Sequence, residues 1–204
     1  MRLTVTFKNL TYPQISMTTE FRAELKIPKE RIAVLIGADG EIKKEIEDRT
    51  GTHLEIDSEE GDVFITGDDG LKIFDAREVV HAIGRGLNPQ TAFLLLKGDY
   101  VFEIINIKDY AATKKAEQRL KGRVIGTEGK TRNVIETLTE SYISVYGKTV
   151  SIIGQPEAAS NAKQAITQLL KGAQHNTVYS WLEKKRKSLK QKEMISPYKE
   201  EDDF

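Results

Sequence analysis

The sequence predicts an α+β fold built from two similar domains, and three observations support this. A shift of 89 residues places Gly37 on Gly126 and Gly40 on Gly129. The same shift aligns the segments that follow these glycines, and a shift of 87 aligns VFITG with VSIIG. In both copies the apolar periodicity changes between the helical and the strand pattern at matching places. An internal duplication accounts for all three observations.

The first copy reads as β-α-α-β-β-α. Pro28 marks the start of its first helix, and Ile42 and Ile46 lie four residues apart on its second. Gly51 follows this second helix at the position that favours a left-handed cap. The expected elements are a strand at 24–28, helices at 29–36 and 41–50, strands at 52–57 and 63–67, and a closing helix at 71–86.

The second copy repeats this order, with a longer first helix. Its expected elements are a strand at 100–107, helices at 112–125 and 131–139, strands at 141–146 and 149–154, and a closing helix at 154–172. The connector NPQTAFLLLKGD is apolar, so we expect the two domains to pack side by side. The predicted organisation is an N-terminal segment at 1–20 with a candidate strand at 2–7, a first domain at 21–87, the connector at 88–99, a second domain at 100–175 and a C-terminal segment at 176–204.

Composition excludes several classes of protein. The chain has 204 residues, 31 basic and 31 acidic, so average charge gives no indication of an acidic partner. It has no cysteine, which excludes disulfide and thiolate chemistry. No apolar run approaches the roughly 20 residues of a membrane span, and no signal peptide is recognisable, so a cytoplasmic location is expected.

Catalytic patterns are not found. The three histidines, His53, His81 and His175, are scattered without metal-ligand spacing. The acidic GDDG at 67–70 ends a predicted strand and is interpreted as a turn with a helix cap. Phosphate-binding loops of nucleotide enzymes, nucleophile elbows and paired catalytic carboxylates do not occur. We therefore expect a protein that is not an enzyme and has no cofactor or metal.

The paired glycines indicate phosphate binding. A helix that begins at a glycine loop leaves its first N–H groups without intrahelical partners, and its dipole adds positive charge there. Glycines let a phosphate approach the backbone closely because no Cβ intervenes. The two loops read GADG at 37–40 and GTEG at 126–129.

This loop within a β-α-α-β-β-α unit resembles the type I KH domain, which holds about four nucleotides of single strand on its GxxG loop. The resemblance implies that helices and loop hold the sugar–phosphate backbone while an apolar strand faces the bases. In the second copy the residues implied are Lys121, Arg123, Ile125, Gly126, Thr127, Glu128, Gly129, Lys130, Thr131 and Arg132 for the backbone, with Ile135, Ile143 and Val145 as the groove floor.

The two copies differ in charge. Residues 29–49 carry five basic and six acidic side chains, whereas residues 111–135 carry seven basic and two acidic. Asp39 stands inside the first loop, where it would repel a phosphate. The second domain is therefore expected to bind RNA, because phosphate contacts depend on cations. The first loop, Gly37, Ala38, Asp39 and Gly40, is expected to be a weak RNA site or a partner site.

The C-terminal segment leaves two interpretations open. Residues 183–192 contain six basic residues and one acidic residue, so this helix either follows an RNA backbone or is an ordinary solvated helix. Tyr179 and Trp181 could stack on bases, but we expect them to anchor the helix to its own domain.

A wider resemblance extends from about residue 24 to about 190. The connector, the long helix before RVIGTEGKTRNVIE and the segment VYSWLEKK are similar to the partner-of-Nob family of KH proteins, which act in small-ribosomal-subunit biogenesis. The acidic first loop of this chain agrees with that family, whose first KH copy is divergent. The lack of a long N-terminal extension indicates the archaeal form. Glu140 departs from the pattern, since it replaces the helix-ending glycine of the first copy.

The family resemblance implies binding of single-stranded RNA near the 3′ end of small-subunit ribosomal RNA through the second domain. It further implies protein contacts by the first domain, with the endonuclease that trims this end and a translation-initiation-factor subunit as partners. Two alternatives are a protein-interaction scaffold and a general KH RNA-binding or RNA-processing subunit without rRNA preference. The bound RNA sequence, the partner's identity, the oligomeric state and any RNA binding by the first domain are not specified by the sequence.

Overall fold

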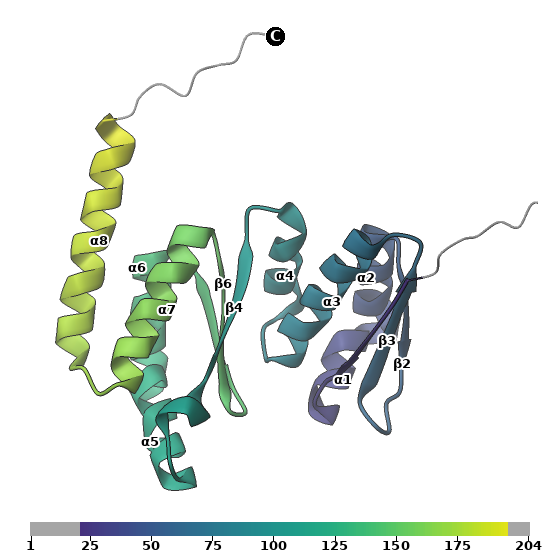
Figure 1. Cartoon of the computed structure of the whole chain (residues 1–204), viewed down its shortest axis with the longest axis horizontal. Coiled ribbons are helices and arrows are strands. Elements are labelled where there is room, and N and C mark those ends of the chain that lie inside the picture. The colour runs from purple at the N-terminus through teal and green to yellow at the C-terminus, as the bar shows by residue number, and fades with distance from the viewer. Residues whose placement is uncertain (1–20, 196–204) are drawn as a thin grey trace, which may run out of the picture.

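A computed structural model describes residues 21–195, with side chains as far as residue 191. The candidate strand at 2–7 and the acidic end of the chain lie outside these residues. The first copy forms one three-stranded sheet covered on one face by three helices (Figure 1). Its elements are β1 (Phe21–Lys26), α1 (Lys29–Ile36), the short turn η1 (Ala38–Gly40), α2 (Glu41–Thr50), β2 (His53–Ile56), β3 (Asp62–Gly67) and α3 (Gly70–Gly84).

The second copy has the same order, and a final long helix follows it. The strand orders β1-β3-β2 and β4-β6-β5 correspond, and every pairing is antiparallel. The predicted fold, an α+β chain of two β-α-α-β-β-α units, is therefore confirmed. The remaining elements are α4 (Pro89–Ala92), η2 (Phe93–Lys97), β4 (Val101–Asn106), η3 (Ile107–Tyr110), α5 (Lys114–Ile125), η4 (Thr127–Gly129), α6 (Lys130–Thr139), β5 (Tyr142–Tyr146), β6 (Thr149–Gly154), α7 (Pro156–Leu170) and α8 (His175–Ile195).

Matching hydrogen bonds show that the duplication extends to side chains. Glu47 Oε1 accepts from the N–H of Leu54 at 2.7 Å, and Glu136 Oε1 accepts from the N–H of Ile143 at 2.7 Å. In each copy the bond joins the second helix to the edge strand that follows it. Such side-chain acceptors satisfy an edge N–H that the sheet leaves without a partner.

The ends of these second helices also match, although their residues differ. Gly51 has φ 63° and ψ 34°, and Glu140 has φ 56° and ψ 41°. Both residues are left-handed helix caps, and Gly51 was predicted to be one in the first copy. Glu140 is one of three residues other than glycine with positive φ among the described residues.

We expect Glu140→Gly to stabilise the protein by about 1 kcal/mol, because a residue with a Cβ is strained in the left-handed region. The loss of the 3.4 Å contact between Arg186 and Glu140 should matter little at this exposed site. Chemical denaturation measures the change. Gly51→Glu is the matched control and should lower stability by a similar amount. A destabilised Glu140→Gly variant would contradict this explanation.

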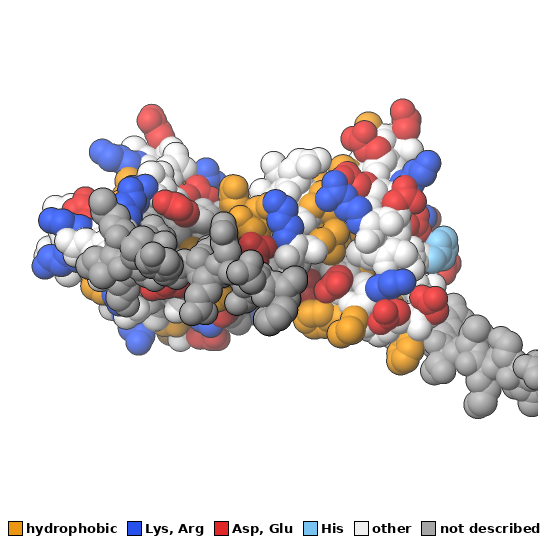
Figure 2. Space-filling view, turned by 90° about the horizontal axis from the view of Figure 1, so that it is seen from above, with side chains coloured by type: hydrophobic (Ala, Val, Ile, Leu, Met, Phe, Trp, Pro, Cys, Tyr) orange, Lys and Arg blue, Asp and Glu red, His pale blue; other side chains and the backbone are white. Residues whose placement is uncertain are grey.

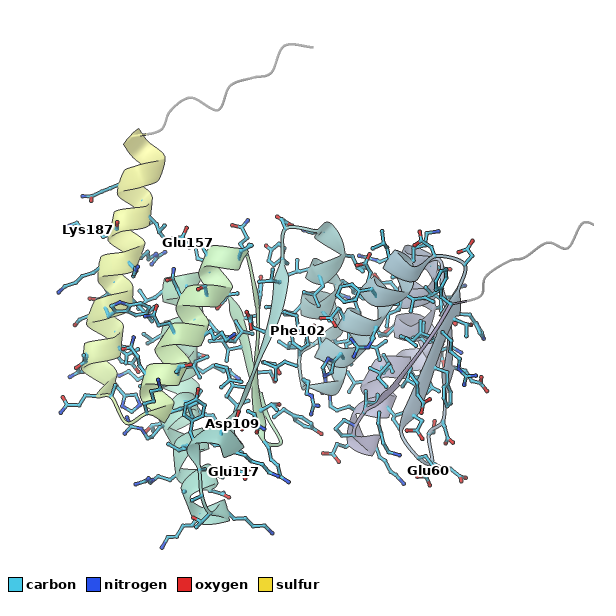
Figure 3. All side chains as sticks on the ribbon, in the orientation of Figure 1. Glu60, Phe102, Asp109, Glu117, Glu157 and Lys187 are labelled. Atoms are coloured by element: carbon cyan, nitrogen blue, oxygen red, sulfur yellow. The ribbon has the colours of Figure 1, made fainter. Side chains whose placement is uncertain are left out.

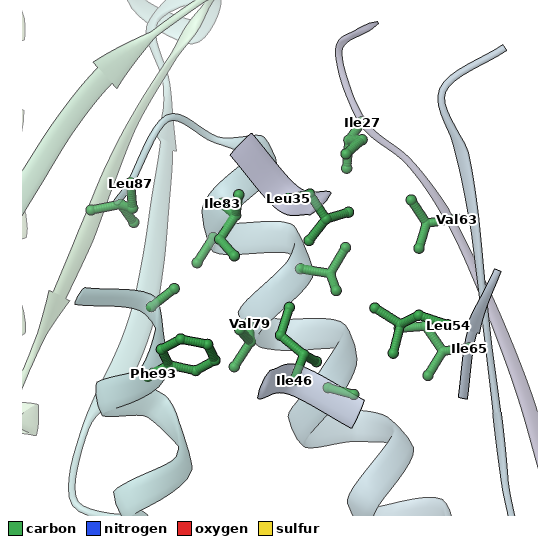
Figure 4. Packing of buried hydrophobic residues seen from close by; sticks show 14 of the residues in the cluster. Ile27, Leu35, Ile46, Leu54, Val63, Ile65, Val79, Ile83, Leu87 and Phe93 are labelled. Carbon is green, nitrogen blue, oxygen red and sulfur yellow. The ribbon is translucent and has the colours of Figure 1, made fainter. Parts of the chain in front are cut away.

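The core of the first domain lies between its helices and one face of its sheet. Leu35 and Ile46 from the helices meet Leu54 and Ile65 from the strands, and Ile83 of α3 completes the contact (Figure 4). All five side chains are inaccessible to solvent. The opposite face of this sheet carries charged side chains instead, including Arg22, Glu24 and Glu55, so it is suited to solvent.

The second sheet packs against other elements on both faces, most completely at its central strand β6, which explains its more continuous apolar strands. Ile152 points into the core of its own domain, whereas the neighbouring Ile153 packs in the core cluster of the first domain. Phe102 lies beside it between β4 and α3, with its ring 5.5 Å from that of His81 (Figure 3). The two copies are thus stacked so that the second sheet lies against the helices of the first (Figure 1).

The connector and the tip of the second sheet strengthen this contact. Phe93 in η2 is 4% exposed, so the connector is part of the core, as its apolar sequence predicted. At the other end, the Tyr146 hydroxyl donates to Glu30 Oε1 at 2.5 Å. Gly86 lies against the same tyrosine, where a Cβ would be only 2.7 Å from Tyr146 Cβ.

His81 gives the interface a pH dependence. Burial lowers the pKa of His81 to about 4, and the charges of Arg85 and Arg77 act in the same direction. The ring is neutral and accepts a hydrogen bond from Arg85 Nε at 3.3 Å. Phe102 is its partner from the second domain.

We expect this histidine to cost stability as the pH falls from about 6.5 to about 4, because the unfolded chain then binds a proton that the folded ring does not. The limiting slope for one proton is about 1.4 kcal/mol per pH unit, and partial solvent exposure reduces it. Free energies of unfolding across this range measure the effect. His81→Gln should flatten the slope, and equal slopes for both proteins would refute the assignment.

Candidate nucleic-acid interface

The two glycine loops have the same backbone. Gly37 has φ 76° and ψ 179°, and Gly126 has φ 74° and ψ 175°. Each loop ends in a left-handed glycine that begins the next helix, Gly40 in the first and Gly129 in the second. Neither helix start is capped by a side chain. The first N–H of each helix donates back into its loop, from Glu41 to the carbonyl of Ala38 and from Lys130 to that of Thr127, so the positive end of the helix dipole is what each start offers to an anion.

Gly126 is required by close packing as well as by its backbone angles. A Cβ at this position would lie 2.3 Å from Thr131 Oγ1 and 2.7 Å from Thr131 N. Around Gly129, by contrast, the nearest atom would be 3.8 Å away. The first glycine therefore fixes the turn onto α6, and the second leaves its surroundings open.

The final helix supports this loop from behind. The Tyr179 hydroxyl donates to Thr131 Oγ1 at 3.0 Å, directly behind Gly126. His175 Nε2 lies 2.9 Å from the carbonyl of Arg123 near the end of α5. α8 thus contacts residues on both sides of the loop. The sequence did not indicate that His175 or Tyr179 would support the loop itself. The contact with Tyr179 and the partial burial of Trp181 confirm that these aromatics anchor the helix.

Charge distinguishes the two loops. Thr127, Glu128 and Lys130 are exposed in the second loop, so Lys130 can reach a phosphate held at the start of α6. The position that matches Lys130 in the first copy is Glu41, and Asp39 is exposed beside it. Because the backbones agree, this difference in side chains alone separates the phosphate affinity expected of the two loops.

The free edge of β5 faces α6. Glu136 accepts from the N–H of Ile143, so this N–H points away from β6 and towards α6. Strand alternation places the N–H and C=O of Val145 on the same free edge. Arg132 Nε lies 3.6 Å from Glu136 Oε2, which places a cation beside the start of this edge. The arrangement offers backbone groups to a base and a cation to its phosphate.

Comparisons with known proteins agree with this arrangement. Residues 101–187 match the eukaryotic-type KH domain (KH-domain type I), in the form of the second KH domain of PNO1, and residues 22–82 match the KH domain. A KH domain-containing protein of Methanocaldococcus jannaschii is 49% identical over 170 residues, which cover 81% of this chain and 74% of that protein. The chain belongs to the KH-domain family. Its relatives include archaeal Dim2p and eukaryotic PNO1.

Further relatives of this KH protein are known in sequence and structure. The pre-rRNA-processing protein PNO1 of Chaetomium thermophilum is 34% identical over 106 residues, but these cover 50% of this chain and 41% of PNO1. The crystal structure of Dim2p from Pyrococcus horikoshii is 48% identical with a TM-score of 0.75, covering 80% of this chain and 99% of Dim2p. Dim2p in a complex with a/eIF2α and rRNA from the same organism is 47% identical with a TM-score of 0.78, covering 83% and 96%.

Three predicted contacts of the second KH domain need correction. Ile135 is fully buried and Ile143 is 4% exposed, so both side chains belong to the core beneath the groove and not to its floor. Arg123 donates to the carbonyls of Leu169 and Ala173 at 3.2 and 2.5 Å. It therefore caps the end of α7. Arg31 does the same in the first KH domain, donating to Ile83 and Leu87.

The other predicted residues lie around the loop and differ in their exposure and in their contacts with the rest of the protein. Lys121 forms an ion pair with Glu117 at 3.1 Å, and its side chain is 29% exposed. Thr131 is 4% exposed and holds Tyr179, so it shapes the loop from inside. Ile125, Gly126 and Val145 are half-buried, as expected for residues that line a shallow groove.

Outside the loop, the remaining acidic motif has a structural role. The GDDG turn caps α3, because the Asp69 side chain accepts from the N–H of Leu71 at 2.8 Å, as predicted. In the part of the chain that the structure describes, no group of three potential metal ligands occurs. None of the helices within residues 21–195 is both long and apolar enough to cross a membrane.

Proposed function

We propose that this protein binds single-stranded RNA through its second KH domain, near the 3′ end of small-subunit ribosomal RNA, during ribosome biogenesis. The single observation that carries the proposal is Lys130 at an uncapped helix start, on a loop whose acidic twin has the same backbone. The complex of the relative Dim2p with rRNA supports the choice of RNA. The exposed Lys130 in the second loop, against Asp39 and Glu41 in the first, supports the choice of domain.

The proposed mechanism is a clamp in which the backbone and the bases are held by different groups. The side chain of Lys130 and the N–H groups of Thr127 and Glu128 hold phosphates, and Arg132 neutralises charge beside them. Ile125 gives the bases an apolar surface, and the free edge at Val145 offers hydrogen bonds to a base. These steps are binding steps, and the proposal includes no catalytic role.

The first KH domain is proposed to serve protein contacts, because Asp39 and Glu41 disfavour phosphate at its loop. The Dim2p complex contains the initiation-factor subunit a/eIF2α, which supports such a subunit as a partner. An endonuclease that trims the rRNA 3′ end is a further proposed partner, and the cytoplasm is the proposed location. A role in ribosome biogenesis is supported by one relative, PNO1, whose name states that it processes pre-rRNA.

Ultraviolet crosslinking of the full chain to total RNA tests this function. We expect the crosslinked peptides to include residues 121–145 and the crosslinked nucleotides to cluster at the small-subunit RNA 3′ end. Crosslinks spread over many unrelated RNAs would favour a general KH subunit. Crosslinks confined to residues 29–56 would contradict the assignment to the second domain.

A further inference from the structure

A trough runs between α6 and α8, starting at the glycine loop. It consists of two adjoining hollows of about 820 and about 400 Å³, which share Leu138 and Glu183. The first hollow is lined by Thr127, Glu128, Lys130, Asn133, Val134 and Thr137, and the second by Arg186, Lys187, Lys190 and Gln191. The loop proposed to hold phosphates is therefore one end of the trough, and the basic part of α8 is the other.

The packing of α8 determines which of its residues face this trough. Leu182 is 1% exposed and Leu189 is half-buried, and both lie on the side of α8 that packs on its domain. Residues one helical step around, Glu183, Lys187 and Lys190, line the trough, whereas Lys184 lines neither hollow. Tyr179 fixes this orientation through its bond to Thr131. The packing of α8 therefore determines that Lys187 and Lys190 face the trough.

The charge of the trough suits a polyanion. Lys130, Lys187 and Lys190 are exposed along it, while Glu128 and Glu183 are its acidic residues. Arg186 also lines it, 3.4 Å from Glu140. Along residues 183–191, α8 carries five basic residues against the single Glu183. Figure 3 shows Lys187 on α8 at the outer end of the molecule, and Figure 2 shows both basic and acidic side chains at this end.

The floor of the trough is apolar. Val134 and Leu138 are half-buried on the side of α6 that faces α8. Proteins that bind single strands combine a positive groove, which follows the backbone, with apolar or aromatic surface for the bases. The trough has both features, and it is continuous with the loop at Lys130. A solvated basic helix, the other interpretation of its sequence, does not by itself account for a hollow that joins lysines of α8 to the loop at Lys130.

We propose that the trough between α6 and α8 is a second RNA subsite, which binds the backbone of nucleotides adjoining those held by the glycine loop. The inference rests on the proposed function, since the same strand occupies both. Lys187 and Lys190 contact its phosphates, and Val134 and Leu138 contact its bases. The site extends the RNA footprint beyond the four nucleotides typical of one KH domain.

The test compares RNA length with charge reversal on α8. Three single strands are titrated: one of four nucleotides, and the same four extended by six uridines on the 5′ or on the 3′ side. The test protein is the full chain carrying Lys187→Glu and Lys190→Glu. Its matched control carries Lys184→Glu and Lys185→Glu, an equal change of charge on the same helix outside the trough.

We expect the trough variant to bind one of the extended strands about 10-fold more weakly than the wild type, with the four-nucleotide strand changed less than about 2-fold. Its salt dependence for the extended strand should fall by about 1.4 in the slope of log K against log salt, for two lost phosphate contacts. The control should lose much less. Equal losses in both variants, or equal losses for short and long strands, would overturn the proposal.

Different results would disprove the proposed function and the second subsite. Lys130→Glu weakens binding of the four-nucleotide strand if the loop holds RNA, whatever happens at α8. If the loop variant binds that strand normally, the function proposed for the second KH domain is wrong. If the loop variant loses binding while the trough variant binds every strand like its control, only the second subsite is wrong.

Discussion

Replacing Lys130 by Glu is expected to weaken binding of a short single-stranded RNA by about 10- to 100-fold. The change gives the second loop the acidic residue that the first loop has at Glu41, on an unchanged backbone. A charged hydrogen bond to phosphate is worth about 1.5–3 kcal/mol, and each 1.4 kcal/mol is about tenfold in affinity. Fluorescence anisotropy at several salt concentrations measures the loss and the change in salt dependence.

The reverse change in the first domain is the matched control. Glu41→Lys should alter affinity by less than about 2-fold, because Asp39 remains in that loop and the first domain contributes little to RNA binding. Both residues are exposed, so neither change should affect folding. If Glu41→Lys strengthened binding as much as Lys130→Glu weakened it, the two domains would share the RNA and the proposed division of labour would be wrong.

Gly126→Ala is expected to destabilise the second domain by about 3 kcal/mol. Its φ of 74° and ψ of 175° lie in a region that only glycine populates, and the added Cβ would meet the backbone nitrogen of Thr131 at 2.7 Å. The variant should also bind RNA poorly, since Thr131 lies in the first turn of α6, the helix proposed to hold the phosphate. Denaturant unfolding gives the stability, and titration of the folded fraction gives the affinity.

Gly129→Ala separates the clash from the backbone strain. Gly129 has φ 77° and ψ 8°, and its surroundings are open to a Cβ, so we expect a cost of about 1 kcal/mol. Comparable costs for the two variants would mean that Thr131 does not pack against the first glycine as described. A large loss of RNA affinity without any loss of stability in Gly126→Ala would contradict the steric explanation.

Most of the fold could be predicted because the sequence contains two copies of the same unit. Matching glycines, helices and strands specify one domain, and the second copy confirms each element. The stacking of the second sheet on α3 was less accessible, since it depends on which face Ile153 and Phe102 occupy. The packing on both faces is visible in the sequence only as the apolar strands VFEIIN and TVSIIG, compared with FRAELK and DVFITG in the first copy.

The candidate site was predictable at its loop and less so around it. Glycine spacing and local charge identify Lys130, because these depend on neighbours in the sequence. Arg123 was wrongly placed among the phosphate contacts, since a cation near a loop looks the same in sequence whether it faces solvent or the carbonyl of Leu169. Tyr179 and His175 could not be assigned to the loop, because their contacts cross about 50 residues of chain.

Backbone amide NMR during titration with a single-stranded RNA tests the central claim most directly, because it observes both loops in one sample. We expect the amide signals of residues 126–130 to shift progressively and saturate, while those of residues 37–41 stay in place. Signals that shift in the first loop, or that remain unchanged in the second while RNA binds, would contradict the claim that Lys130 and the start of α6 hold the RNA backbone.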